Sequence, residues 1–169
     1  MTTDGGAIGA RDEDPGARLV ALWQAVAPAM ADLPIYNACL DVRATRFIHH
    51  GGWRVGVVTT PWFMNVIALP NAPEMLPSQG SIIIVSLPAG DLEAIAGQLD
   101  GFGPMATVSL FSPMENFDDA DVAGNVAEAA LTALFEPPAA PEPVPEPPRA
   151  PTTVDRRSLL FGRRGGEPT

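Results

Sequence analysis

The 169-residue sequence contains no lysine, one cysteine and two histidines, and each shortage argues against a class of function. All ten positive charges are arginines, and twenty acidic residues bring the net charge to −10. Because a chain this acidic repels nucleic-acid phosphates, we do not expect nucleic-acid binding. A single cysteine, Cys39, forms no internal disulfide and no Cys-x-x-Cys metal site, which fits a reducing compartment. Its apolar neighbours predict that the Cys39 side chain is small and buried.

The sequence also lacks any apolar run of the roughly 20 residues that a membrane helix needs. The N-terminal residues 1–16 are acidic and glycine-rich, without the apolar core of a secretory signal peptide. We therefore expect a cytoplasmic protein that does not contact a membrane directly.

Motifs of well-known catalytic sites are missing as well: no phosphate loop, no dinucleotide-binding glycine pattern, no His-Glu-x-x-His and no Gly-x-Ser-x-Gly. The two histidines, His49 and His50, are adjacent, and adjacent strand residues point to opposite faces. The acidic run at 115–121 lacks the spacing of a calcium loop and predicts a solvated helix start. We predict no enzymatic activity, no cofactor and no metal.

Changes in composition divide the chain into four segments. Eight of the fifteen residues from 137 to 151 are proline, which is typical of an extended spacer. We expect a disordered leader at 1–13, one domain at 14–136, the proline-rich linker at 137–151 and a basic, apolar tail at 152–169.

Within the domain, hydrophobic spacing predicts two helices and several strands. Asp14 and Pro15 are typical of a helix start, and we expect helices at 15–31 and 118–135. Strands are predicted at 41–48, 53–59, 63–69, 81–87 and 107–111, and a turn at 49–52. The segment 92–98 fits either a strand or a helical turn. This order predicts an α+β two-layer sandwich, with a mostly antiparallel sheet of four to six strands flanked by an N-terminal and a C-terminal helix.

Two stretches stand out, T-P-W-F-M-N-V-I-A-L-P at 60–70 and S-L-F-S-P-M-E-N-F at 109–117. Each is an apolar strand beside a proline, with a methionine and an aromatic residue at the junction. Such residues are frequent at protein interfaces, but a methionine and aromatic stripe is more often part of a core. The residues alone thus indicate an α+β domain without a catalytic constellation and with two possible binding edges.

Read in order with G-G-W-R-V-G-V-V-T and S-L-P-A-G, these stretches resemble the HybE/HupJ family of nickel–iron hydrogenase assembly chaperones. The resemblance covers about 15–136. One departure is that Glu115 and Asn116 stand between S-P-M and the following phenylalanine. Some members of the family are linked to a rubredoxin, but one cysteine provides no such iron site here.

The resemblance implies a chaperone that binds the small-subunit precursor, with its twin-arginine signal peptide, and/or the large subunit during cofactor maturation before export. Which subunit is the primary client stays open. An alternative is an electron-transfer or oxygen-protection accessory that works with a separate rubredoxin or other maturation factors. A third possibility is a small enzyme that uses Cys39 or the histidines.

We expect the two unusual stretches to form one partner-binding patch, with acidic neighbours that attract the arginines of a signal peptide. Because side chains alternate along a strand, either Trp62 and Met64 or Phe63 and Asn65 reach the partner. The predicted site residues are Trp62, Phe63, Met64, Asn65, Phe111, Pro113, Met114, Glu115, Phe117 and Asp118, with Asp119 as a further counter-charge.

The tail contains D-R-R-S-L-L-F at 155–161, which resembles a twin-arginine export motif at the wrong end of the chain. On a spacer of about 3.1 Å per residue, it can reach some 45 Å from the domain. It is predicted either to imitate a precursor in the chaperone's own groove, to bind another maturation factor, or to have no role. The residues concerned are Arg156, Arg157, Leu159 and Leu160.

Overall fold

The computed structural model describes residues 13–140, and its compact unit ends at Pro138. The predicted leader, most of the linker and the arginine motif of the tail lie outside the described residues. The described elements are α1 (Pro15–Met30), β1 (Arg43–Ala44), β2 (Ile48–His50), β3 (Trp53–Thr59), β4 (Met64–Pro70), a 3-10 turn (Pro73–Met75), β5 (Ile82–Leu87), β6 (Gly90–Leu99), β7 (Gly103–Phe111) and α2 (Ala120–Phe135).

Both helices begin at an aspartate that caps the free N–H groups of the first turn. The Asp14 carboxylate accepts a hydrogen bond from the N–H of Gly16 at 3.0 Å. At α2, the Asp119 carboxylate accepts from the N–H groups of Asp121 and Val122, at 2.7 and 3.1 Å. Both helices therefore start and end within two residues of the predicted limits.

The segment predicted as one strand at 41–48 is divided into β1 and β2, so that prediction was wrong. The N–H of Thr45 donates to the carbonyl of Val57 at 2.9 Å, but the N–H of Val57 donates to the Thr45 hydroxyl instead of a carbonyl, also at 2.9 Å. A side chain thus takes the place of the backbone in the ladder, and regular pairing stops there.

The predicted turn at 49–52 is shorter than expected. His49 and His50 belong to β2 and pair with Arg54 and Trp53. Only Gly51 and Gly52 form the turn, with φ of 53° and 87°. Two consecutive positive φ values are typical of the tight hairpin turn that favours glycine.

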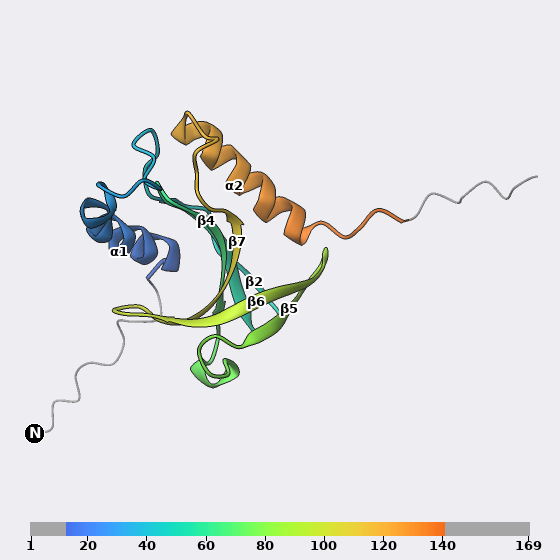
Figure 1. Cartoon of the computed structure of the whole chain (residues 1–169). Coiled ribbons are helices and arrows are strands. Elements are labelled where there is room, and N and C mark those ends of the chain that lie inside the picture. The colour runs from blue at the N-terminus through green and yellow to red at the C-terminus, as the bar shows by residue number, and fades with distance from the viewer. Residues whose placement is uncertain (1–12, 141–169) are drawn as a thin grey trace, which may run out of the picture. The chain divides into compact units, whose positions relative to one another are not determined.

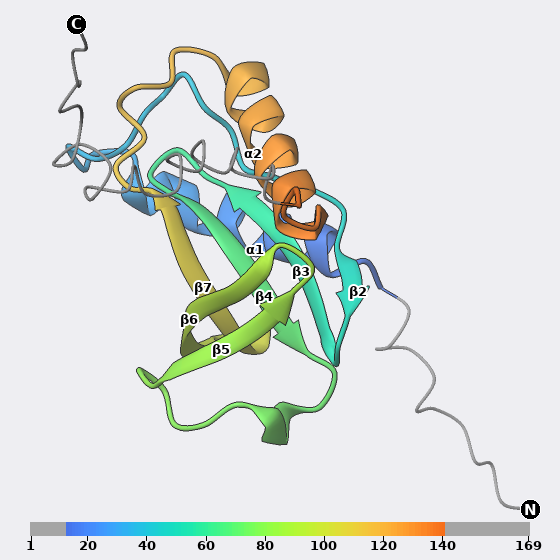
Figure 2. The ribbon, with the colours of Figure 1, turned by 90° about the vertical axis from the view of Figure 1, so that its right-hand side faces the viewer.

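The strands form one antiparallel sheet in the order β1-β3-β4-β7-β6-β5, with β2 paired to the other part of β3 (Figure 2). The ambiguous segment 92–98 is part of β6 and pairs on both sides, with β5 and with β7. The β5 strand pairs only with β6 among the described residues, so it lies at one edge of the sheet.

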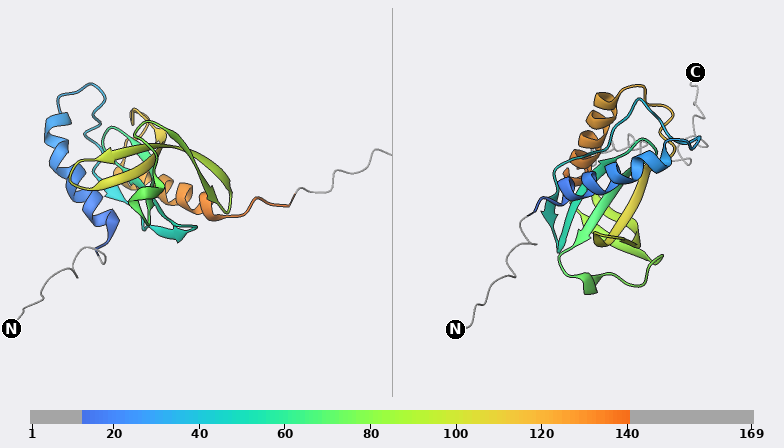
Figure 3. Two further views of the ribbon diagram at one scale, coloured as in Figure 1. Left: turned by 90° about the horizontal axis from the view of Figure 1, so that it is seen from below. Right: turned by 90° about the vertical axis from the view of Figure 1, so that its left-hand side faces the viewer.

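The two helices lie on opposite faces of the sheet (Figures 1 and 3). On one face α2 covers the larger core, which includes Val55, Val57, Met64, Val66, Ala106, Ala123, Ala127 and Leu131. On the other face α1 covers a smaller core of Leu19, Val58, Ile67, Leu69 and Met105. The predicted α+β class, a mostly antiparallel sheet flanked by two helices, is confirmed, and the structure adds that each helix has its own face.

Candidate partner-binding surface

Four of the predicted site residues are buried, which corrects the expectation that they stand at a surface. Met64 and Met114 are wholly buried in the core beneath α2. Phe117 is buried in the same core, and Trp62 is buried against the rings of Tyr36 and Trp23, with centroids 6.0 and 6.3 Å away. These side chains serve the fold because large apolar groups gain most when they are removed from water.

The end of β7 and the segment that follows it keep several of the predicted residues accessible. Phe111 is 40% exposed, with its ring 5.1 Å from that of Phe117 in an edge-to-face arrangement. Pro113, Glu115 and Asp118 are exposed. This segment therefore presents one aromatic ring beside two carboxylates.

The two unusual stretches do not form a single patch. In the register between β4 and β7, Phe111 pairs with Met64, on the face that α2 covers. Phe63 packs with the core on the α1 face, and Asn65 lines a hollow on that same face. Since neighbouring strand residues point to opposite sides, the accessible parts of the two stretches are separated by the sheet.

The accessible part of the first stretch lines a surface hollow, which we call the α1-face hollow. Its volume is about 230 Å³, and it is lined by Trp23, Phe63, Asn65, Ile67, Gln79, Gly97, Gln98, Leu99, Met105 and Thr107. The hollow lies where Trp23 of α1 meets β4, β6 and β7, whereas α1 makes its main sheet contacts with β1 and β3. The Trp23 ring lies 5.3 Å from that of Phe63.

Two polar atoms of residues that line the α1-face hollow have no partner among the described residues. They are the indole Nε1 of Trp23, a donor, and the Oδ1 of Asn65, an acceptor, and both are buried. An unpaired buried polar group costs about 1–3 kcal/mol.

Sequence reasoning singled out Phe63 and Asn65 but missed most of the hollow. Trp23, Gly97, Leu99 and Met105 belong to none of the motifs that the sequence offers. These residues come from separate elements that meet only through the strand order, so no local pattern identifies them.

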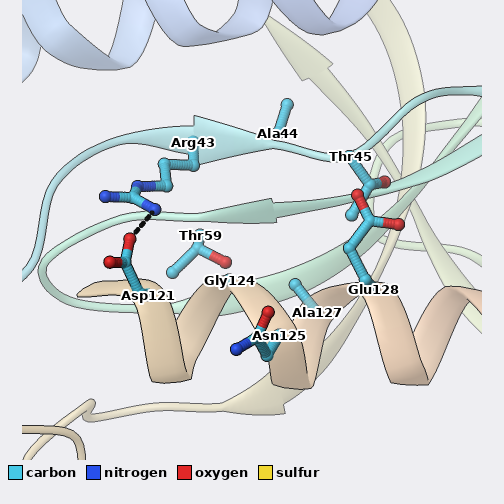
Figure 4. A pocket seen from close by; sticks show the side chains of 9 residues that line it. All are labelled: Arg43, Ala44, Thr45, Thr59, Asp121, Gly124, Asn125, Ala127 and Glu128. Atoms are coloured by element: carbon cyan, nitrogen blue, oxygen red, sulfur yellow. Dashed lines mark hydrogen bonds and ion pairs between the residues drawn. The ribbon is translucent and has the colours of Figure 1, made fainter. Parts of the chain in front are cut away.

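A second hollow lies between β1 and α2 and is built around Arg43 (Figure 4). Its volume is about 290 Å³, and its lining is Arg43, Ala44, Thr45, Thr59, Asp121, Gly124, Asn125, Ala127 and Glu128. The Arg43 guanidinium donates to the carboxylates of Asp41 and Asp121, the latter at 2.7 Å. These hydrogen bonds, the one to Asp41 first, raise the pKa of Arg43 above its ordinary value. Arg43 thus joins the start of α2 to β1.

The candidates for chemistry are dispersed over residues 13–140. Cys39 is exposed, which corrects the expectation of a buried thiol, and His49 and His50 are exposed on β2. No three His, Cys, Asp or Glu side chains in this range are grouped so as to hold a metal ion. In the same range, neither helix combines the length and apolar character that a membrane span requires.

An antiparallel sheet with a helix on each face and an open, mostly apolar hollow defines an α+β protein with a surface suited to a partner. The chain belongs to the HybE family of hydrogenase assembly chaperones: the family described as "NiFe-hydrogenase assembly, chaperone, HybE" matches residues 14–162.

Similar proteins support the assignment of the chain to this family. The chain is 43% identical over 141 residues to the hydrogenase expression/formation protein HupJ of Bradyrhizobium diazoefficiens, covering 81% of this chain and 83% of the relative. It is 33% identical over 111 residues to a probable rubredoxin HupJ of Rhodobacter capsulatus, covering 63% of this chain but 39% of that protein. The solution structure of HybE from Escherichia coli has the same fold, with a TM-score of 0.57, 24% identity and coverage of 94% and 96%.

Proposed function

We propose that this chain is a cytoplasmic assembly chaperone for a nickel–iron uptake hydrogenase. It binds the small-subunit precursor through its twin-arginine signal peptide and/or the large subunit, and it holds the client until the cofactors are in place before export. The observation that carries this proposal is the family match over residues 14–162, together with a relative described as a hydrogenase expression/formation protein. In this role the chain performs no chemistry of its own.

The charge of the domain supports a basic client. Residues 13–140 contain fourteen acidic side chains and four arginines. Of these arginines, Arg43 is paired with Asp41 and Asp121, and Arg18 lies near Glu13 and over the Phe102 ring. Complementary charge speeds association and favours the correct partner. An arginine-bearing signal peptide is therefore attracted to this surface, whereas another acidic protein is repelled.

Burial supports one of the two alternatives for the strand around Trp62. Phe63 and Asn65 are half-buried and line the α1-face hollow, whereas Trp62 and Met64 are buried. We therefore assign client contact to Phe63 and Asn65. Phe111, Pro113, Glu115 and Asp118 form a second contact region, on the far side of the sheet.

The test is affinity purification of the full chain from cells that express the hydrogenase operon, with the bound subunits identified. We expect the wild type to capture the small-subunit precursor with its signal peptide, the large subunit, or both. Phe63→Ala reduces the captured amount, and the matched control Val122→Ala, an exposed residue of α2, leaves it unchanged. Capture of neither subunit by the folded wild type contradicts the proposal.

A second candidate function follows from the longer relative described as a probable rubredoxin. The chain then works with a separate rubredoxin, as an electron-transfer or oxygen-protection accessory of hydrogenase maturation. This function predicts that rubredoxin co-purifies with the chain and that deletion impairs hydrogenase activity only in cells grown with oxygen. An equal defect with and without oxygen contradicts it and leaves the assembly role.

A further inference from the structure

The open edge of the sheet is formed by β5, and its geometry determines which backbone groups are free. Figure 2 shows β5 at the margin of the sheet, with β6 on its inner side. Leu87 and Gly90 close a two-residue hairpin turn and therefore form a hydrogen-bonded pair. Because such pairs alternate along an antiparallel ladder, the N–H and C=O groups of Ile82, Ile84 and Ser86 point away from β6. No backbone hydrogen bond from a described residue reaches these groups.

The side chains beside this edge are apolar and exposed. Ile82, Ile84 and Ile95 are 71%, 52% and 55% exposed, and Ile82 pairs directly with Ile95. Sheet edges are usually protected by charges, prolines or bulges, yet β5 reads I-I-I-V-S-L and contains none of these. An exposed apolar strand with free backbone groups is a template for one more strand.

This edge is continuous with the α1-face hollow. Ile95 pairs with Thr107, which lines the hollow, so both residues lie in one row on the same face of the sheet. A segment that binds along β5 therefore has room to direct its following residues towards Trp23 and Asn65.

Charge distinguishes between the possible occupants. Asp91 and Glu93 are exposed and pair with Ser86 and Ile84, so both carboxylates lie near the hairpin end of β5. A second copy of this chain, with the same net charge of −10, brings like charges to the same edge. A segment with positive charges at one end and apolar residues after them is complementary to it.

We propose that β5 takes up an extended client segment as an additional antiparallel strand, with arginine or lysine at the beginning of the segment and alternating apolar residues after it. In an antiparallel pair the incoming strand begins beside the end of β5, near Asp91 and Glu93 of β6, and its apolar side chains then pack beside Ile84 and Ile82. This inference rests on the proposed function, since it names the chemistry of the client and the strand that receives it.

The first test measures fluorescence anisotropy with a labelled peptide of two arginines followed by alternating valine and threonine. The double variant Ile82→Thr/Ile84→Thr removes apolar contact but keeps β-branched residues, so the strand is preserved. We expect its affinity for the peptide to fall by about tenfold, which corresponds to about 1.4 kcal/mol. Val122→Thr, which alters an exposed apolar residue of α2, binds like the wild type.

Two modified peptides test the pairing itself. N-methylation at alternate residues in one register blocks the hydrogen bonds to β5, and N-methylation in the other register does not. We expect only one of the two peptides to lose binding. Moving the two arginines to the other end of the peptide, or replacing them with glutamate, also weakens binding by about tenfold if the segment is antiparallel.

Three results overturn the inference: equal affinity for the wild type and the double isoleucine variant, equal binding of both N-methylated peptides, or a wild-type dimer in sedimentation that the double variant abolishes. The last result identifies a second copy as the occupant.

Failure of the proposed function can be distinguished from failure of this inference. If the wild type captures a hydrogenase subunit but the peptide does not bind β5, only the edge assignment falls. If the peptide binds but no subunit is captured, only the proposed function falls.

Discussion

The side-chain amide of Asn37 donates a hydrogen bond to the carbonyl oxygen of Phe117 at 2.6 Å, although the two residues are 80 positions apart. The same Nδ2 donates to the carbonyl of Met114 at 2.9 Å, and Oδ1 accepts from the N–H of Cys39 at 3.0 Å. One asparagine thus joins the connection that follows α1 to the segment that leads into α2. The exposed Glu115 and Asp118 each follow in sequence a residue whose carbonyl accepts one of these hydrogen bonds.

We expect Asn37→Ala to lower the free energy of unfolding by about 1–3 kcal/mol, because two carbonyl groups lose their donor. Urea denaturation monitored by tryptophan fluorescence measures the loss. Asn116→Ala changes an exposed residue of the same segment and is expected to shift stability by less than about 0.5 kcal/mol. Equal stabilities of the two variants would show that the Asn37 amide does not hold this segment.

Position 56 of β3 is occupied by glycine, and the Phe47 ring fills the space that a side chain would need. A Cβ at this position comes within 2.7 Å of the Phe47 ring. Gly56→Ala therefore forces the ring to move, and we expect a loss of about 1–3 kcal/mol in the same measurement. At Gly97 an added Cβ lies 3.7 Å from the carbonyl of Met105, an ordinary contact, so Gly97→Ala serves as the control. If both variants are equally stable, Phe47 adapts without cost.

The aspartates at the start of α2 differ in role although they are adjacent. Asp119 caps the helix through two N–H groups, whereas Asp118 is exposed and belongs to the second contact region that we propose. We expect Asp119→Ala to cost about 1 kcal/mol of stability, as for other N-cap residues. Asp118→Ala leaves thermal unfolding unchanged but reduces client capture. A loss of stability for Asp118→Ala of the same size would remove the distinction.

The ion pairs of Arg43 are exposed, so we expect them to contribute little and to depend on salt. Arg43→Gln lowers the melting temperature slightly at low ionic strength, and the difference from wild type shrinks in 1 M salt because the charges are screened. The control is Arg46→Gln, since Arg46 is exposed and forms no ion pair within residues 13–140. A difference that persists at high salt would mean that packing, not charge, carries the effect.

The tail motif at 155–161 gives a prediction from the sequence alone. If it imitates a precursor, deletion of 152–169 removes a competitor and raises the affinity for the small-subunit precursor. Titration of the full chain and the truncated chain with the same precursor measures the change. Replacing Arg156 and Arg157 with glutamine, which keeps the length, should have the same effect. An unchanged affinity for both variants excludes the imitation.

Much of the fold was predictable where local chemistry decides it. Asp14 before Pro15 located the start of α1, and the strand predicted at 53–59 has the limits of β3. The break at Thr45 was not predictable, because it depends on a hydroxyl that accepts a hydrogen bond from a residue twelve positions away. The segment 92–98 was ambiguous because its small and polar residues have weak preferences, and pairing on both sides makes it a strand.

The candidate site was predictable only in part, for a related reason. The sequence identified the residues 61–65, but burial depends on which face each helix covers, and that follows from the strand order. Phe63 and Asn65 were therefore indistinguishable from Trp62 and Met64 until α1 and α2 were placed on opposite faces. For the isoleucines of β5, the apolar run predicted a strand but not the exposure of Ile82 and Ile84, which follows from the position of β5 at the edge of the sheet.

The division of β4 between two faces gives its neighbouring positions different tolerances to change. Met64 and Val66 are confined by the core under α2, where most substitutions reduce stability. Phe63 and Asn65 lie on the other side of the strand, where Phe63 packs against the core under α1 and both side chains line the α1-face hollow. If the α1-face hollow is the client surface that we propose, substitutions at positions 63 and 65 change the client surface, while Met64 and Val66 of the same strand keep the core under α2 constant.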